Sequence, residues 1–360
     1  MAITLSTIAS HTGFSRTTVG QVLQGRGDQL KIHAETQRVI REAASRLDYR
    51  KCSIGRALRT GKLDVVALVG LARGQPWRLE RQRATAGILR DRGFRVHLFD
   101  LQWDADREDR LFEELLDLKP LGIVISEVRP APRYWKSLQK LHRSGIPLVG
   151  ADGPPDGWAG LPIDRVYLDR EMSAYLAAQH LIELGHRQIA CALPAANIAW
   201  ELRARVGGFR RAMNDAGLPV EKNSVFHPGR RDTDLEIGYE MLDAARRLGC
   251  AATGMITTND QLAIGFIKAC LDSGIRVPQD LSIVGSEDHP VSRFHPIPIT
   301  TLAFPIAEMA ETAVDLLMGR IDGSRGGLEA VRFTPSLVAR ESTAALHVVR
   351  SPLNNPGAPG

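Results

Sequence analysis

The stretch LSTIASHTGFSRTTVGQVLQG, residues 5–25, decides the fold of the amino-terminal part of the chain. Its apolar residues repeat at the spacing of one helical face on both sides of a central glycine. They are Leu5, Ile8 and Ala9 before the glycine, and Val19, Val22 and Leu23 after it. Two short helices joined by a tight turn can bury these faces against each other. The spacing therefore predicts a helix-turn-helix.

The turn between the two helices contains residues suited to joining them. Gly13 can adopt the left-handed conformation that ends the first helix. Ser15 can cap the second helix by accepting a hydrogen bond from the amide of Thr17 or Thr18. The second helix then begins at Ser15, and its outward residues are Arg16, Thr17, Gly20 and Gln21. Such side chains would face the base edges in a DNA major groove.

The distribution of charge favours DNA binding over a merely structural helical hairpin. Residues 1–61 contain ten Lys or Arg and four Asp or Glu, a balance of +6. The remaining residues contain 36 basic and 37 acidic side chains. A local concentration of positive charge is expected where a protein contacts phosphates.

A third helix and a basic segment follow. From about Glu35, one apolar stripe completes a three-helix core; it consists of Val39, Ile40, Ala43 and Leu47. The segment DYRKCSIGRALRTG, residues 48–61, is rich in Arg and Lys. It is either a solvated linker or a short helix, capped by Ser53, that folds on DNA and inserts Leu58 between base pairs of the minor groove.

The rest of the chain alternates short apolar runs with helical patterns. Such alternation predicts parallel sheets with helices on both faces. A first series closes with IPLVGAD at residues 146–152, and a second begins near Ile163, so we expect two similar lobes. Because ligands of such sheets lie at the carboxyl ends of strands, we expect a binding site between the lobes. Residues 346–360 lack apolar periodicity and are expected to form a flexible tail.

Composition limits the class of protein. The 360 residues contain no long uncharged apolar run, and MAITLSTIAS lacks the basic-then-apolar order of a signal peptide. We therefore expect a cytoplasmic protein with no membrane partner. The four cysteines, Cys52, Cys191, Cys250 and Cys270, lack CxxC spacing, so neither a zinc site nor a disulfide framework is predicted.

Two other classes fit less well. An enzyme on an α/β scaffold is disfavoured because no GxGxxG follows a strand, no nucleophile elbow appears, and GRALRTGKL (residues 55–63) departs from the P-loop pattern. The group Glu287, Asp288, His289 and His295 lacks helical metal-ligand spacing, so we expect no metal and no cofactor. A transport-type sugar receptor is disfavoured by the basic head and the missing signal peptide.

The sequence resembles the lactose-repressor and galactose-repressor (LacI/GalR) family of bacterial transcriptional regulators over about residues 3–344. The segments that carry the resemblance include TIASHTGFSRTTVGQVLQGRG, GRALRTGK, HLIELGHRQIA, RVGGFRRAM, TTNDQLAIGFIKACLDSGIRVPQDLSIVGSED and TPSLVARESTA. The resemblance implies an all-α helix-turn-helix head and an α/β, two-lobed body of the periplasmic-binding-protein-like type I fold. It also implies a homodimer, a pseudo-palindromic double-stranded DNA operator and a small effector, sugar-like or alternatively a nucleobase.

The resemblance also implies domain boundaries. The helix-turn-helix domain spans residues 1–50, the hinge 51–61 and the effector-binding and dimerisation domain 62–345. In the body, the N-lobe comprises about 62–161 and 292–323, and the C-lobe about 162–291 and 324–345. The chain is then expected to cross between the lobes near Leu161, Val291 and Gly323.

Site residues are carried over position by position. The DNA-contacting residues are Thr4, Ser15, Arg16, Thr17, Thr18, Gln21, Arg26, Arg50, Arg56 and Leu58, and the effector-contacting residues are Trp77, Asp152, Trp200, Arg205, Asn259 and Glu287. An indole can stack on a sugar ring while the polar groups bond its hydroxyls. Without the resemblance, Trp77 would be interpreted as a core aromatic and Arg205 as a surface ion-pair partner.

Several positions depart from the family pattern. In the hinge, Lys51 and Cys52 replace Pro-Asn, and Gly55 replaces an alanine, which weakens a hinge helix by about 1 kcal/mol. Gly20 replaces a serine in the recognition helix, and the loop 27–33 is about two residues longer. Ser286 and Glu287 replace a common aromatic residue and aspartate in the pocket.

Overall fold

The computed structural model describes residues 3–23, 25, 27–49, 63–70, 76–101, 105–126, 132–153, 160–193, 199–228, 234–346 and 353. The chain divides into two compact units, Met1–Leu63 and Asp64–Gly360. This boundary lies within two residues of the one expected between hinge and body. No helix in the described part of the chain is long and apolar enough to cross a membrane.

The head is a three-helix unit, as predicted. It contains α1 (Leu5–Thr12), α2 (Arg16–Leu23) and α3 (Ala34–Arg46). Gly13 has φ 72° and its amide bonds the carbonyl of Ala9, which ends α1. The core consists of Ile8, Val19, Val22, Ile40, Ala43 and Ala44. The expected outward position of Gly20 is wrong: Gly20 is buried, and a Cβ there would lie 3.7 Å from the Leu5 side chain, because this side of α2 packs on α1.

The first lobe is built on a six-stranded sheet with strand order β11-β5-β4-β3-β1-β2. The pairs β1–β2, β3–β4, β4–β5 and β5–β11 are parallel. The elements of this lobe are β1 (Leu63–Gly70), α5 (Pro76–Asp91), β2 (Arg95–Asp100), α6 (Ala105–Leu118), β3 (Pro120–Ile125), α7 (Pro132–Arg143), β4 (Leu148–Gly150), β5 (Asp164–Leu168), α13 (Ile306–Ile321) and β11 (Ala330–Phe333).

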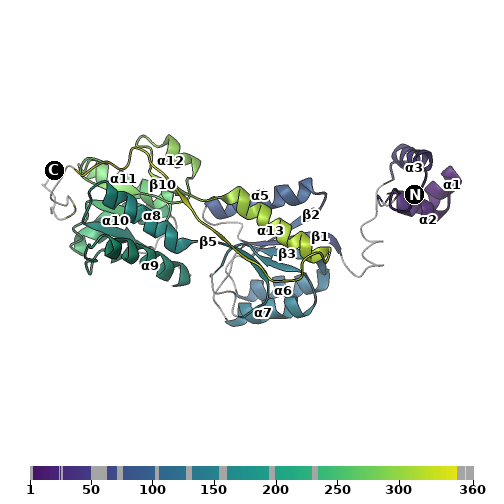
Figure 1. Ribbon diagram of the computed structural model, residues 1–360, viewed down its shortest axis with the longest axis horizontal. Coiled ribbons are helices and arrows are strands. Elements are labelled where there is room, and N and C mark those ends of the chain that lie inside the picture. The colour runs from purple at the N-terminus through teal and green to yellow at the C-terminus, as the bar shows by residue number, and fades with distance from the viewer. Residues whose placement is uncertain are drawn as a thin grey trace. The chain divides into compact units, whose positions relative to one another are not determined.

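Side chains of β1 alternate between the two faces of this sheet. Val66 and Leu68 pack in a cluster with residues of α5 and α13, whereas Ala67 and Val69 pack in a second cluster with residues of α6 and α7. The helices accordingly lie in two layers on opposite sides of the sheet (Figure 1). The predicted α/β architecture is confirmed.

The second lobe is built on a four-stranded parallel sheet with strand order β7-β6-β8-β9. Its elements are α8 (Arg170–Glu183), β6 (Ile189–Ala192), α9 (Ala199–Asp215), β7 (Val225–Phe226), α10 (Asp234–Arg247), β8 (Gly254–Thr257), α11 (Asp260–Asp272), β9 (Ser282–Val284) and α12 (Pro290–Phe294). The antiparallel pair of β10 (Thr301–Ala303) and β12 (Ser336–Val338) joins this lobe, since bridges connect residues 284 and 287 to residues 300 and 303.

The expected lobe boundaries are wrong in detail. Residues 162–168 and 324–333, assigned to the C-lobe, contribute β5 and β11 to the sheet of the first lobe. Residues 292–303, assigned to the N-lobe, remain with the second lobe through β10. The chain therefore crosses near 169, 304–305 and 334–335, and not near Leu161, Val291 and Gly323. A short strand of mixed polarity such as DRVYL can join either sheet, so the sequence pattern does not reveal which sheet it joins.

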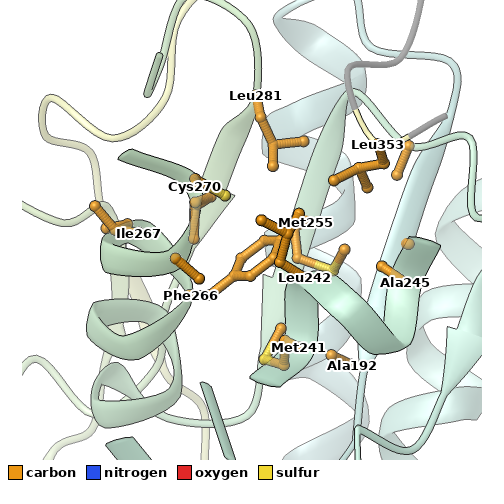
Figure 2. Close-up of a cluster of buried hydrophobic side chains, with 14 of the residues drawn as sticks. Ala192, Met241, Leu242, Ala245, Met255, Phe266, Ile267, Cys270, Leu281 and Leu353 are labelled. Carbon is orange, nitrogen blue, oxygen red and sulfur yellow. The ribbon is translucent and has the colours of Figure 1, made fainter. Parts of the chain in front are cut away.

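Two described residues of the C-terminal segment, Leu346 and Leu353, contact the second lobe. Leu353 is 1% exposed and belongs to the apolar core cluster of the second lobe, which also contains side chains of α10, α11 and β8 (Figure 2). Leu346 also bonds through its amide to the carbonyl of Leu184. The expected flexible tail over 346–360 is wrong at Leu353, because a single leucine without periodic neighbours gives no helical or strand signal.

Candidate functional sites

The exposed end of α2 is the candidate DNA-reading face. Ser15, Arg16 and Thr17 are exposed at its first turn, while Thr18 and Gln21 are half-buried. The Ser15 hydroxyl accepts a hydrogen bond from the amide of Thr18 at 3.0 Å, which confirms the predicted cap. The hydroxyls of these two residues are 2.8 Å apart. Both therefore stabilise the helix start that presents Arg16 and Thr17.

Thr4 occupies the corresponding position before α1. It forms a capping box with Thr7, in which each side chain bonds the other residue's amide at 3.2 Å. Contact of these residues with DNA stays a prediction. Arg26, Arg50, Arg56 and Leu58 lie outside the described residues, as do the hinge positions Lys51, Cys52, Ser53 and Gly55.

In the body, Asp152 follows β4 and lies among arginines. Its Oδ2 is 2.9 Å from Nη2 of Arg170, 3.5 Å from Nη1 of Arg81 and 3.8 Å from Nη1 of Arg78. Arg78 and Arg81 come from α5 of the first lobe, and Arg170 is the first residue of α8 in the second. The Asp152 carboxylate, which is 3% exposed, is therefore a counter-ion that links the two lobes.

Glu201 on α9 is a second shared carboxylate. It accepts hydrogen bonds from Arg78 at 2.8 Å and Arg205 at 3.2 Å, and its Oε2 lies 3.8 Å from Nε of Arg170. Burial raises the pKa of Glu201, but the charges of Arg170, Arg78 and Arg205 outweigh it and hold the pKa well below its usual range. Glu201 is therefore ionised, and its bond to Arg78 is another link between the lobes.

Trp77 does not offer an open ring face. It is 2% exposed and packs edge-on against Phe304, with ring centroids 5.4 Å apart. The guanidinium carbons of Arg78, Arg81 and Arg170 lie 5.0, 4.6 and 4.7 Å from its ring centroid. In this structure the indole is thus a core aromatic that stabilises buried cations, and the expected stacking of a sugar ring on it stays a prediction.

Asn259 and Asp260 lie at the start of α11, where their side chains make hydrogen bonds. The Asn259 side chain accepts a bond from the amide of Leu262 at 2.9 Å and donates one to Asp234 at 2.7 Å. Asp260 accepts bonds from Thr301 Oγ1 at 2.6 Å and from the amide of His289 at 2.8 Å. Burial raises the pKa of Asp260 to about 6. Asn259 therefore acts here as a helix cap, and its expected contact with an effector is untested.

Glu287 differs from the other carboxylates because neither of its oxygens has a hydrogen-bond partner, although the residue is only 4% exposed. Its backbone has φ 106°, in the left-handed region that disfavours side chains. Burial, with a contribution from the charge of Asp260, raises the pKa of Glu287 well above its usual range. A strained residue with a buried, unbonded carboxyl is typical of a binding site.

The neighbours of Glu287 that resemble metal ligands have other roles. Asp288 pairs with Arg340 at 2.5 Å, His289 caps α12 through Nδ1, and His295 Nδ1 lies 2.9 Å from the carbonyl of Ile297. In the described residues no group of three or more His, Cys, Asp or Glu is placed to hold a metal ion.

Comparison with known proteins agrees with this architecture. A family model described as a periplasmic binding protein-like domain matches residues 178–343. The HTH-type transcriptional regulator DegA of Bacillus subtilis is 29% identical over 350 residues, which cover 96% of this chain and all of DegA. A ribose-bound LacI-family transcriptional regulator from Enterococcus faecium is 26% identical, covers 78% of this chain and 99% of its own, and has a TM-score of 0.65.

The fold of the chain also resembles that of a solved repressor. The lac repressor dimer bound to operator and the anti-inducer ONPF has a TM-score of 0.77 and 22% identity, with 96% of this chain and 100% of that chain covered. Over nearly its whole length the chain is therefore similar to bacterial transcriptional regulators, the LacI family among them. It is a helix-turn-helix transcriptional regulator with a periplasmic binding protein-like body.

Four members of the ion cluster around Asp152 and Glu201 were not predicted from the sequence: Arg78, Arg81, Arg170 and Glu201. Two sequence signals were available. Arg78 and Arg81 are one and four positions after Trp77 on one helix, and Glu201 precedes Arg205 by four residues, the spacing of a helical ion pair. Trp200, half-buried in the first turn of α9, is adjacent to Glu201. The predicted residues Trp77, Asp152 and Arg205 do come together around this cluster, whereas Asn259 pairs with Asp234.

Proposed function

We propose that this regulator binds, as a homodimer, a DNA operator with approximate two-fold symmetry, and that a small sugar-like effector bound by the body changes its operator affinity. The observation that carries the proposal is the exposed pair Arg16 and Thr17 at the start of the second helix of a helix-turn-helix. The solved lac repressor is a dimer on its operator, which supports the same assembly here.

The body supports an effector rich in hydroxyl groups. Glu287 has two carboxyl oxygens without a partner, and each can bond a hydroxyl. Arg205, 11% exposed, has further N–H donors beyond its bond to Glu201. The Enterococcus relative is solved with ribose. A nucleobase, the alternative ligand, is less well supported because the Trp77 ring on which it would stack is already covered.

We further propose that the protein acts by binding, without catalysing a reaction, and that it works in the cytoplasm, where bacterial DNA lies. The sequence contains no GxGxxG after a strand, no P-loop pattern and no nucleophile elbow. A regulator needs only a difference in affinity between two conformations.

The experiment is selection of binding sites from random double-stranded DNA by the full chain, followed by binding titrations at several salt concentrations. We expect selected sites to contain inverted half-sites and the affinity to fall steeply with salt, because Lys and Arg release counterions from phosphates. The measured complex should contain two chains per site. Selection of single half-sites bound by monomers would contradict the proposal, and so would an affinity independent of salt.

A further inference from the structure

We propose that the effector is an anion, a small hydroxylated carboxylate or phosphate ester, and that Arg170 and Arg205 bind its charged group. This inference rests on the proposed effector function and adds the chemical class of the ligand. Neutral monosaccharides are then poor ligands of this body.

The first argument is the composition of the ion cluster that joins the lobes. Four guanidinium groups, from Arg78, Arg81, Arg170 and Arg205, share the carboxylates of Asp152 and Glu201 in the described part of the cluster. Each carboxylate lies within 4 Å of three of these arginines. All six side chains are at most 11% exposed. Buried cations grouped in this way favour a further anion.

The second argument is the hydrogen bonding of Arg170. Its side chain is 0% exposed and one terminal nitrogen bonds Asp152 at 2.9 Å, but Nη1 has no hydrogen-bond acceptor. The guanidinium carbon lies 4.7 Å from the Trp77 ring centroid and 5.7 Å from that of Phe304, which stabilises the charge without satisfying the donor. A carboxylate or phosphate oxygen would satisfy it.

The third argument is the effect of the arginine charges on the pKa values of Arg205 and Glu201. Burial, and next the positive charge of Arg170, lower the pKa of Arg205. The same arginine charges hold the pKa of Glu201 low against the effect of burial. The positive charges of Arg170 and Arg78 thus act on Arg205 in addition to its burial, and Arg205 is one of the two more accessible arginines of the cluster.

Glu287 is placed to bind the part of the ligand that carries hydroxyl groups. Its unbonded carboxyl is influenced by the charges of Arg78 and Arg205, so it lies near the cluster. A carboxyl oxygen accepts hydrogen bonds from hydroxyl groups, and a protonated carboxyl also donates one. The ligand that satisfies both features has one anionic group for the arginines and hydroxyls for Glu287, as in a sugar acid or a sugar phosphate.

The test uses the full chain and small metabolites from the cells that express it. An ultrafiltered extract is separated on an anion exchanger into a retained and an unretained fraction, and each is assayed for its effect on the melting temperature. The variants are Arg205→Gln, which removes the charge, Arg205→Lys, which keeps it, and Arg211→Gln as a matched control. Arg211 is on the same helix, and its ion pair with Glu171 is exposed.

We expect the retained fraction to stabilise the wild type, Arg205→Lys and Arg211→Gln. For Arg205→Gln we expect the concentration needed for the same shift to rise by about 10- to 100-fold, as for loss of a hydrogen bond to a charged group. Treating the retained fraction with phosphatase distinguishes the two sources of charge: the effect disappears for a phosphate ester and persists for a carboxylate.

Three outcomes would overturn the inference. Stabilisation by the unretained fraction alone would show a neutral effector and leave the proposed function intact. Equal stabilisation of wild type and Arg205→Gln by the retained fraction would place the anion elsewhere. If neither fraction shifts any melting temperature, the proposed effector function fails, and the inference fails with it.

Discussion

Replacing Glu201 by glutamine should strongly destabilise the body. Glu201 is 7% exposed and accepts bonds from Arg78 at 2.8 Å and Arg205 at 3.2 Å. At an effective dielectric constant of about 20, these attractions are each about 5–6 kcal/mol, and the desolvation of each ion offsets several kcal/mol. Removing one member of a buried pair, with its partners left in place, costs about 3–5 kcal/mol. Glutamine preserves the size of the side chain, so the change in the free energy of unfolding measures the effect of losing the charge.

The assay is thermal unfolding of the full chain, with Glu171→Gln as the control. Glu171 also pairs with an arginine of α9, Arg211, but both side chains are more than 40% exposed, so we expect a loss of about 0–1 kcal/mol. For a body of this size each kcal/mol lowers the melting temperature by about 2 °C. Glu201→Gln should therefore melt about 6–10 °C below wild type, and the control within about 2 °C.

The pH dependence gives an independent check of the same reasoning. The folded-state pKa of Glu201 lies below its unfolded value, so the ionised carboxylate stabilises the protein above the unfolded pKa and that stabilisation is lost as pH falls. The difference in melting temperature between wild type and Glu201→Gln should therefore become smaller below about pH 4. If Glu201→Gln lowered the melting temperature at neutral pH by no more than Glu171→Gln does, the buried cluster would not link the lobes.

Three further predictions concern other parts of the chain. Burial raises the pKa of Asp260 to about 6, so ionising its carboxyl lowers the free energy of unfolding. Between pH 4 and 7 the wild type should lose about 2 kcal/mol of stability relative to Asp260→Asn, and a difference that does not change with pH would contradict this. Leu353→Ala should lower the free energy of unfolding by about 2–5 kcal/mol. Leu328→Ala, at a leucine 56% exposed, should lower it by less than about 0.5 kcal/mol. Equal effects would mean that the Leu353 contact does not persist in solution. Arg16→Ala should lose about 1–3 kcal/mol of discrimination at one base pair of the selected operator. Arg38→Ala, at an arginine paired with Glu35 and Glu42, should lose none. Binding that is weakened equally on all DNA sequences would make Arg16 a phosphate contact.

The sequence predicts the head well because its signals are local. The apolar spacing around Ile8 and Val19, the glycine at 13 and the cap at Ser15 each depend on residues within one or two helical turns, and the structure confirms them. Gly20 was placed on the wrong side because a glycine adds nothing to an apolar stripe. Its burial depends on the angle at which α1 crosses α2.

In the body, the order of elements is predictable and the partners of individual side chains are not. The alternating pattern predicts parallel strands, but whether residues 164–168 pair with β4 depends on the path of the chain between lobes. The ionic role of Asp152 depends on Arg170, which is 18 residues away, and on arginines of α5 more than 70 residues away. Such partners are determined by tertiary structure, so a residue's type and position did not distinguish a ligand contact from a counter-ion.

The three crossings between the lobes lie side by side, because β5 pairs with β11 on one side and β10 with β12 on the other. A strip of this kind bends by rotating a few backbone dihedral angles, whereas twisting it would break the strand pairs. The amide of Glu287 bonds the carbonyl of Leu302 at 2.8 Å, two residues before the crossing at Phe304. A molecule that bonded the Glu287 carboxyl would therefore act close to the crossings, where a small displacement would become a large one at the far ends of the lobes.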